Sequence, residues 1–442
     1  MSSAPISIKF LDASDKNFHS DLEKALARDA LVTSEVKNLV AGILGAVREQ
    51  GDAAVVGYTN RFDNRNVSGM EELLVTGEQL ARALGAIDQV DARALHHAAE
   101  RIRAYHEKQK QSSWHYEEAD GSVYGQKITP LTKAGIYVPG GKANYPSSML
   151  MLAIPAQVAG VKEIIATVPT PYQEQNNDSN LVFAAAAMSG VSKVFTIGGA
   201  QAIAAMAYGT DTVPKVDKIT GPGNIYVTEA KKQVFGDVGI DMLAGPSELT
   251  IICDGGTDPD WIAMDLFSQA EHDENAQSIL ITPDRQFIEA VTSSINRLLP
   301  GMDRQDIIRS SLQDRGILIQ VEDLRQAARI SNQIAPEHLE LSVADPESLV
   351  DSIEHAGAIF LGRNTAEALG DYCAGPSHVL PTSGTARFFS ALGVYDFQKR
   401  SSIINCSRDG ADRMAATTAT LARKESLQAH ALSAEYRLKQ KG

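Results

Sequence analysis

The sequence is poor in cysteine and in positive charge. Its three cysteines, Cys253, Cys373 and Cys406, are widely spaced and form no CxxC pair. An odd set of this kind argues against a disulfide framework and against a thiolate zinc site, and it favours a reducing compartment. The balance of 41 basic to 55 acidic residues gives a net charge of −14. That charge disfavours nucleic acid as a partner, because binding phosphate requires a basic surface.

Long hydrophobic runs are also missing. The first residues, Met1–Ser7, lack the basic region followed by an apolar run that marks a secretory signal, and no segment approaches the roughly 18 apolar residues of a membrane span. We therefore expect a cytoplasmic protein with no membrane contact. The content of 43% hydrophobic and 22% charged residues is typical of a soluble protein, and 442 residues suffice for two or three domains.

Strands and helices are predicted to alternate through most of the chain. One series of strand, turn and helix runs from Lys133 to Val234, and a second runs from Leu249 to Leu361. Repeated units of this kind predict parallel sheets with helices on both faces. Two such halves facing each other would form a cleft, and we expect the functional site there.

Three strand-to-helix turns of the first series are rich in glycine: residues 139–141, 198–199 and 221–224. Such turns lie at the carboxyl edge of a parallel sheet, where open α/β sheets bind ligands. Glycine lets the backbone approach a pyrophosphate, and helix N-termini present free amides to it. No GxGxxG occurs in these turns. By themselves they fit dinucleotide binding and simple tight turns equally well.

Several polar groups are candidates for chemistry. Gln269 and His272 are three residues apart in a predicted helix, and an amide oxygen beside a neutral imidazole can hold a divalent metal, although such pairs also line ordinary solvated helices. Pro336 is predicted to begin a helix whose first turn carries Glu337 and His338, either as an acid and a base or as solvated ends. The other candidates are unremarkable singly: Ser247, Asp371, His378, Glu425 and His430. A predicted helix over about 90–112 carries three further histidines that we expect to be solvated: His96, His97 and His106.

Many short motifs occur in one order along the chain. They are PGGKANYPSS, GGAQAIAA, GPGN, AGPSE, SQAEHD, APEHLEL, GDYCAGPSHVLPT, DFQKR and ESLQAH. With these motifs the chain resembles the histidinol dehydrogenase family over about residues 30–436. The resemblance implies a zinc- and NAD-dependent enzyme that oxidises L-histidinol to L-histidinal and then to L-histidine, the last two steps of histidine biosynthesis.

The resemblance also implies roles for individual residues. One zinc per subunit would be held by Gln269, His272 and Asp371, with His430 coming from the other subunit of a homodimer whose active sites are shared. His338 would take the alcohol proton, and Glu337 would activate water for attack on the aldehyde. Histidinol would contact Ser247, Gln269, His272, His338, Asp371, His378, Glu425 and His430. NAD would contact Tyr137, Gln201 and Asn224.

The expected fold is α/β, with two incomplete Rossmann-like domains of parallel sheet facing a cleft. A small N-terminal arm and a C-terminal helical tail that reaches the partner subunit would complete it. The boundaries that we expect are 1–30 for the arm, 31–136 with 247–392 for the domain carrying the metal and catalytic residues, 137–246 for the NAD domain, and 393–442 for the tail.

Two rivals differ in chemistry. A paralogous zinc- and NAD-dependent dehydrogenase would oxidise another small polar alcohol, such as a sulfonated diol. It would share the metal and NAD positions and differ where the far end of the substrate binds, so the presence of Ser247, His378 and Glu425 favours histidinol. A scaffold without activity would bind a nucleotide as a regulatory ligand, and it would have no reason to keep one zinc per subunit.

Overall fold

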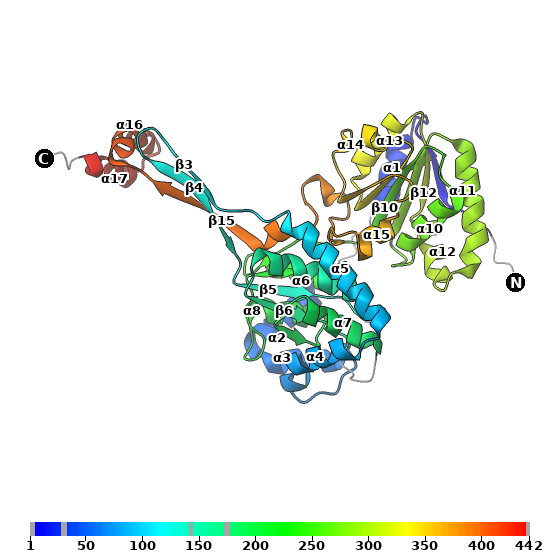
Figure 1. Ribbon diagram of the computed structural model, residues 1–442, viewed down its shortest axis with the longest axis horizontal. Coiled ribbons are helices and arrows are strands. Elements are labelled where there is room, and N and C mark those ends of the chain that lie inside the picture. The colour runs from blue at the N-terminus through cyan, green and yellow to red at the C-terminus, as the bar shows by residue number, and fades with distance from the viewer. Residues whose placement is uncertain (1–4, 28–32, 141–144, 172–176, 439–442) are drawn as a thin grey trace.

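A computed structural model describes residues 5–27, 33–140, 145–171 and 177–438 of the chain. In this part of the chain, two α/β bodies are each built round a six-stranded sheet, and an elongated tail extends from one of them (Figure 1). The predicted α/β class with parallel sheets is confirmed. None of the helices in the described ranges is long and apolar enough to cross a membrane.

The first sheet, sheet A, is parallel throughout, with the strand order β1-β12-β11-β10-β13-β14. Its central strands are continuous apolar runs, because helices cover both faces. The strands are β1 Lys9–Asp12, β10 Glu248–Cys253, β11 Gln277–Thr282, β12 Ile317–Gln320, β13 His338–Ser342 and β14 Ala358–Leu361. On one face lie α10 Pro259–Ala270, α11 Arg285–Leu298 and α12 Gln305–Asp314; on the other lie α1 Phe18–Leu26, α13 Leu324–Ile334 and α14 Glu347–Val350. The short helix α15, Glu367–Tyr372, contacts α10.

The second sheet, sheet B, has the order β2-β7-β6-β5-β8-β9, and only β2 pairs antiparallel to its neighbour among the described strands. Its strands are β2 Leu74–Val75, β5 Lys133–Tyr137, β6 Glu163–Thr167, β7 Lys193–Phe195, β8 Lys218–Thr220 and β9 Gly239–Ile240. One face is covered by α2 Ser34–Gln50, α3 Asp52–Phe62, α8 Gly199–Tyr208 and α9 Ile225–Val234. The other is covered by α4 Gly77–Ala86, α5 Gln89–Glu107, α6 Pro146–Ala159 and α7 Asn177–Met188.

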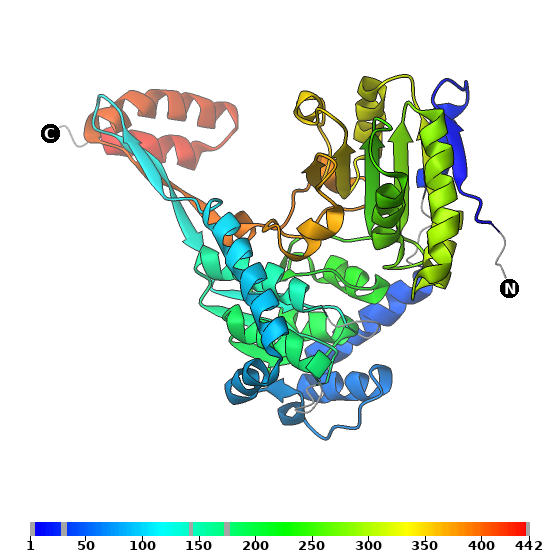
Figure 2. The ribbon, with the colours of Figure 1, turned by 45° about the vertical axis from the view of Figure 1, so that its right-hand side comes forward.

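The tail is a twisted antiparallel ribbon that ends in a helical hairpin. The ribbon joins β3 Trp114–Glu117, β4 Val123–Pro130 and β15 Gln398–Asn405, and the hairpin joins α16 Arg408–Lys424 and α17 Gln428–Leu438. Both views place the hairpin well away from the two sheets (Figures 1 and 2). Short 3-10 helices lie at Met70–Glu72, Leu299–Gly301, Thr385–Arg387 and Val394–Phe397.

The packing corrects the expected domain boundaries in two places. The arm expected over residues 1–30 contributes β1 to the edge of sheet A, where it pairs with β12. Residues 31–136, expected beside the catalytic residues of sheet A, belong instead to sheet B and the tail: α2 contacts α8 and α9, and α4 contacts α7. The apolar faces of these amphipathic helices need a sheet to cover, and the apolar residues of α2 and α8 form one core.

Candidate active site

A cavity of about 190 Å³ lies where the amino end of sheet A meets the carboxyl end of sheet B. Seven residues singled out from the sequence line it together: Ser247, Gln269, His272, Glu337, His338, Asp371 and His378. Sheet B contributes Pro139 and Pro222 from two of its glycine-rich turns. Ser247 immediately precedes β10 and His338 begins β13, so sheet A takes part with its amino edge.

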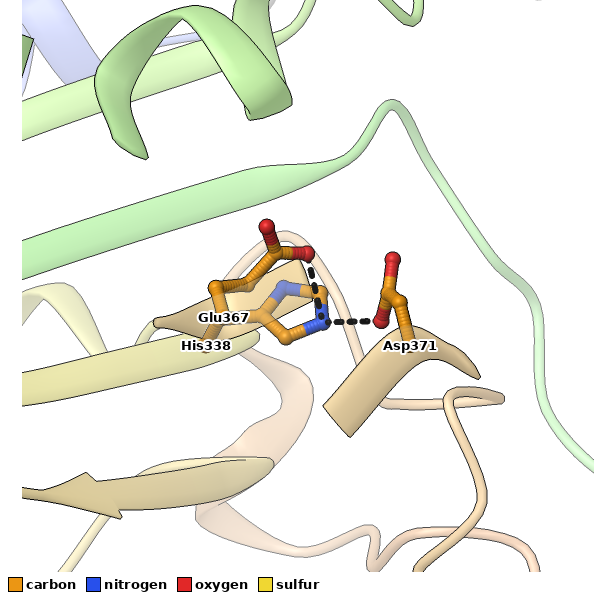
Figure 3. A group of neighbouring side chains, drawn as sticks. All are labelled: His338, Glu367 and Asp371. Atoms are coloured by element: carbon orange, nitrogen blue, oxygen red, sulfur yellow. Dashed lines mark ion pairs between the residues drawn. The ribbon is translucent and has the colours of Figure 1, made fainter. Parts of the chain in front are cut away.

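His338 is held in one tautomer by the backbone. Its ring is buried, and Nδ1 lies 3.0 Å from the carbonyl oxygen of Glu248, so Nδ1 carries the hydrogen and donates it. Nε2 has no well-aligned hydrogen-bond partner among the described residues. It lies 3.4 Å from Asp371 Oδ1 and 3.7 Å from Glu367 Oε1 (Figure 3). Nε2 therefore points at a group of carboxyls.

The expected helix at Pro336 is wrong. The preceding helix, α13, ends at Ile334 because Ala335 adopts the left-handed conformation with φ of 52°, and the chain then enters β13. Leu339 and Leu341 are buried in the sheet core. Glu337 and His338 consequently lie at the beginning of a strand and are buried, rather than on the solvated first turn of a helix.

The buried carboxyls and His338 shift one another's pKa values. Burial lowers the pKa of His338, but the negative charges of Glu337, Asp371 and Glu367 close to the ring outweigh this effect and raise it to about 10. Burial raises the pKa of Asp371, yet the nearby charge of His338 holds it well below its usual range. Burial raises the pKa of Glu337 to about 8, although Glu337 Oε2 accepts the amide hydrogen of Glu248 at 2.8 Å.

The Gln269 amide is a candidate metal ligand. Its side chain is fully buried at the last turn of α10, and neither Oε1 nor Nε2 has a hydrogen-bond partner within the described residues. An unpaired amide in a protein interior is costly, and a cation that accepts the oxygen as a ligand would remove that cost. The helix ends at Ala270, so His272 stands just past it, where burial lowers its pKa and favours the neutral ring that binds metals.

Glu367 is a buried residue of the site that the sequence analysis missed. Donor atoms of His338, Glu367 and Asp371 all lie within 4.8 Å of one another, as a group able to hold a metal (Figure 3). Glu367 Oε2 accepts the Ser268 hydroxyl hydrogen at 3.0 Å, and burial raises the pKa of Glu367 to about 8. The only signal in the sequence was its position four residues before Asp371, which puts both carboxyls on one face of α15.

Both ring nitrogens of His378 form hydrogen bonds. Nδ1 lies 2.9 Å from the carbonyl oxygen of Asp371, so it carries the hydrogen, and Nε2 accepts the Ser148 hydroxyl hydrogen at 3.0 Å. By contrast, Glu425 and His430 are exposed on the tail, and the structure of the single chain does not bring them to the cavity. Glu425 caps the end of α16, and His430 lies in α17.

A second cavity, of about 380 Å³, brings together the three expected cofactor residues, Tyr137, Gln201 and Asn224. The Tyr137 hydroxyl accepts the amide hydrogen of Gly199 at 3.2 Å, and burial raises its pKa to about 12. Gln201 is buried, with Nε2 unpaired as far as the chain is described. Asn224 Oδ1 accepts two amide hydrogens at the start of α9.

The glycine-rich turns shape this second cavity. A Cβ on Gly140 would lie 2.8 Å from the Pro169 ring, which is too close for a carbon–carbon contact. Glycine is therefore the residue that fits at this position without moving Pro169. Pro139 and Pro222 line the first cavity, whereas Gly140 and Asn224 line the second, so two turns border both. Residues 141–144 of the PGGKANYPSS motif lie outside the described residues. The arrangement suits an extended ligand that spans both cavities.

Comparisons with known proteins show the family to which the chain belongs. The family model described as histidinol dehydrogenase matches residues 26–438. Histidinol dehydrogenase from Pseudomonas aeruginosa is 62% identical over 435 residues, which cover 98% of each chain, and that from Methylococcus capsulatus is 62% identical over 434 residues, 98% of this chain and 99% of the relative. The crystal structure of histidinol dehydrogenase from Elizabethkingia anophelis is 32% identical, covers 99% of both chains and superposes with a TM-score of 0.92. This chain belongs to the histidinol dehydrogenase family.

Proposed function

We propose that this protein oxidises L-histidinol through L-histidinal to L-histidine, with two molecules of NAD and one zinc ion per subunit, in the last two steps of histidine biosynthesis in the cytoplasm. The observation that supports this most is the first cavity, in which an unpaired amide, three imidazoles and two carboxyl groups surround one space, with the Glu367 carboxyl close to His338 and Asp371. The second cavity meets it at two glycine-rich turns.

The side chains present suit zinc. Gln269, His272 and Asp371, with His430 of the partner subunit, would hold the ion through nitrogen and oxygen atoms. Nitrogen and oxygen donors without cysteine suit zinc and would also suit manganese or cobalt. An ion bound there would orient the polar groups of histidinol so that its alcohol lies beside His338. The unpaired Gln269 amide is the feature of the chain that supports this assignment.

His338 is the proposed general base. Because its Nδ1 donates to the Glu248 carbonyl, its Nε2 faces the cavity. The carboxylates raise the pKa of the ring to about 10, and a zinc ion held by Asp371 would offset their charge and favour the neutral ring that a base requires. In the first oxidation Nε2 takes the hydroxyl proton of histidinol, while the hydrogen on the same carbon leaves as hydride to the nicotinamide. A base that is fixed in one tautomer and closed off from water needs no reorganisation during the reaction.

Glu337 is the proposed base for the second oxidation. It lines the same cavity, and the Glu248 amide fixes its carboxyl. Glu337 would take a proton from the water that attacks histidinal, leaving the anion of the hydrate, which would lose its hydride to a second NAD and become the carboxylic acid. Ser247, His378 and the partner's Glu425 would hold the remaining polar groups of the substrate.

A homodimer with shared sites accounts for the tail. Its two helices enclose a core of only three alanines, Ala419, Ala422 and Ala431, which is too small to be stable alone. Large apolar side chains are exposed along it: Trp114, Tyr116, Ile404, Leu421, Leu427 and Tyr436. Such a surface is typical of a subunit interface. We propose that the partner covers it and receives His430 and Glu425 in its own site.

Shared sites predict complementation between inactive chains. A dimer of one His430→Ala chain and one His272→Ala chain would have one intact site and one doubly altered site. Mixing them at equal amounts should restore about a quarter of wild-type activity, since half of the random dimers are mixed. If mixing restores none, the sites are not shared.

The activity itself is tested by following NADH formation from L-histidinol. We expect two NADH per histidinol consumed and one zinc per subunit. If the protein forms no NADH from histidinol but does form it from another small polar alcohol, such as a sulfonated diol, the substrate assignment is wrong. Absence of any NAD reduction would overturn the proposed reaction.

A further inference from the structure

Asp63 lines the second cavity and has no role in the proposed chemistry so far. It caps the end of α3 and follows Phe62. The cavity wall beside it is apolar and is formed by Leu39, Ile43 and Phe62. Leu39 and Phe62 are 40% and 42% exposed, unusual values for large apolar side chains that border a cavity. A single carboxyl is therefore set among apolar groups that suit a flat, weakly polar ring.

The carboxyl of Asp63 is incompletely satisfied. Its Oδ2 is closed off from water and has no hydrogen-bond partner in the part of the chain that is described. Burial raises the pKa of Asp63, against opposing effects of Arg65 and of the Gly198 amide. Arg65 acts on this carboxyl through its charge, and Arg65 Nη1 is itself without a hydrogen-bond partner among the described residues. Hydroxyl donors from a ligand would supply what this carboxyl lacks.

The position of Asp63 indicates which part of a dinucleotide it meets. The nicotinamide must reach the first cavity, which meets the second at the turns containing Gly140 and Asn224. Asp63, Leu39 and Phe62 line the second cavity and take no part in the first. They thus suit the opposite end of the ligand, where an adenine ring carries a ribose with two hydroxyls.

We propose that Asp63 accepts hydrogen bonds from the ribose hydroxyls of the adenosine half and so makes this enzyme select NAD over NADP. This inference rests on the proposed function, because it requires NAD in the second cavity. A phosphate on the 2′-oxygen removes a donor and places negative charge against the carboxylate. In a complete dinucleotide-binding fold, the acidic residue that binds the ribose ends the second strand of the sheet. Asp63 occupies a different place, because it lies before the first parallel strand of sheet B in the chain.

Steady-state kinetics with both cofactors test the proposal. The wild-type kcat/KM should be at least about 100-fold higher with NAD than with NADP. Asp63→Asn should raise the KM for NAD about 10- to 100-fold, the effect of losing hydrogen bonds to a charged group, with little change in kcat. The preference for NAD over NADP should shrink. The control is Glu49→Gln, which removes an exposed charge from α2 outside the cavity and should change neither value.

Calorimetric binding of ADP-ribose and of histidinol separates the possible failures. Asp63→Asn, and Asp63→Ser as a second variant, should weaken ADP-ribose binding and leave histidinol binding unchanged. If wild-type protein reduces NAD but both variants keep wild-type KM values, or if wild-type protein uses NADP as well as NAD, the role of Asp63 is wrong. If wild-type protein neither binds ADP-ribose nor reduces NAD, the proposed function itself fails.

Discussion

Lys231 and Asp241 form an ion pair beneath the turn that borders both cavities, with 2.5 Å between Nζ and Oδ1. Their side chains are only 3% and 1% exposed. Both also bind the backbone of Gly221: Lys231 donates to its carbonyl oxygen at 2.9 Å, and Asp241 accepts its amide hydrogen at 2.7 Å. Gly221 has a φ of 116°, so the pair holds a backbone conformation that other residues avoid.

Removing one partner of this pair should cost both stability and cofactor binding. Lys231→Met leaves a buried carboxylate unpaired, and we expect the free energy of unfolding to fall by about 3–5 kcal/mol. The KM for NAD should rise, because the Gly221 turn leads to Asn224. Lys24→Met is the control: it breaks an exposed pair with Asp21 and should change the free energy by less than about 1 kcal/mol. Equal denaturation curves for Lys231→Met and the wild type would show that the pair is not structural.

His338 and His272 are predicted to fail in different ways. His338→Asn should lower kcat about 10²- to 10⁴-fold, the usual contribution of a general base, while zinc content stays at one per subunit. His272→Asn should lose zinc, because it removes a proposed ligand. Metal analysis beside kinetics measures both effects. Full activity in His338→Asn would rule out its role as the base.

Glu337→Gln should separate the two oxidations. The first step needs His338 alone, whereas attack of water on the aldehyde needs the Glu337 carboxylate. With an aldehyde trap present, the variant should form about one NADH per histidinol and release histidinal. Wild-type protein should form two in the absence of the trap. Two NADH per histidinol at the wild-type rate from Glu337→Gln would contradict this assignment.

His106 should make the fold sensitive to acid. It was expected to be solvated, as His96 and His97 are, but it is fully buried in α5, with Nδ1 2.8 Å from the Ile102 carbonyl oxygen. Burial lowers the pKa of His106 below its ordinary value of 6.5. The unfolded chain therefore binds the proton more readily than the folded protein does. The contribution of His106 to the free energy of unfolding is complete above pH 6.5, and it is lost as the pH drops toward and through the pKa of His106 in the folded protein.

The loss of unfolding free energy that His106 causes is at most about 1.4 kcal/mol for each pH unit below 6.5. His106→Gln should be less stable at pH 7 but should lose less stability between pH 6.5 and pH 5. The free energy of unfolding, measured in urea across this range, gives both slopes. His97→Gln, at an exposed position of the same helix, should keep the wild-type slope. If the free energy of unfolding falls with the same slope against pH in His106→Gln and in the wild type, His106 is not the source of the acid sensitivity.

The sequence predicted the members of the site better than their surroundings. The family resemblance grouped Gln269, His272 and Asp371, and all three line the first cavity, while their role as metal ligands stays a prediction. The strand beginning at His338 was taken for a helix, since nothing in the sequence marks Ala335 as left-handed. Glu367 carried no motif, and its role becomes visible only when α15 packs near β13.

The allocation of helices to sheets was also beyond the sequence. A helix was predicted over about 90–112, and α5 spans Gln89–Glu107, but the sequence does not say which sheet this helix covers. Helical periodicity gives the buried face and leaves the partner open. The short edge strand β2 was not visible either, because two residues are too few for an alternating pattern.

The central claim is that residues from two chains hold one zinc ion beside His338. Anomalous diffraction at the zinc edge from crystals soaked with zinc and histidinol tests it most directly. We predict a single peak per subunit in contact with Gln269, His272, Asp371 and the partner's His430. A peak held instead by His338, Glu367 and Asp371 of one chain, with Gln269 and His430 distant from it, would contradict the account.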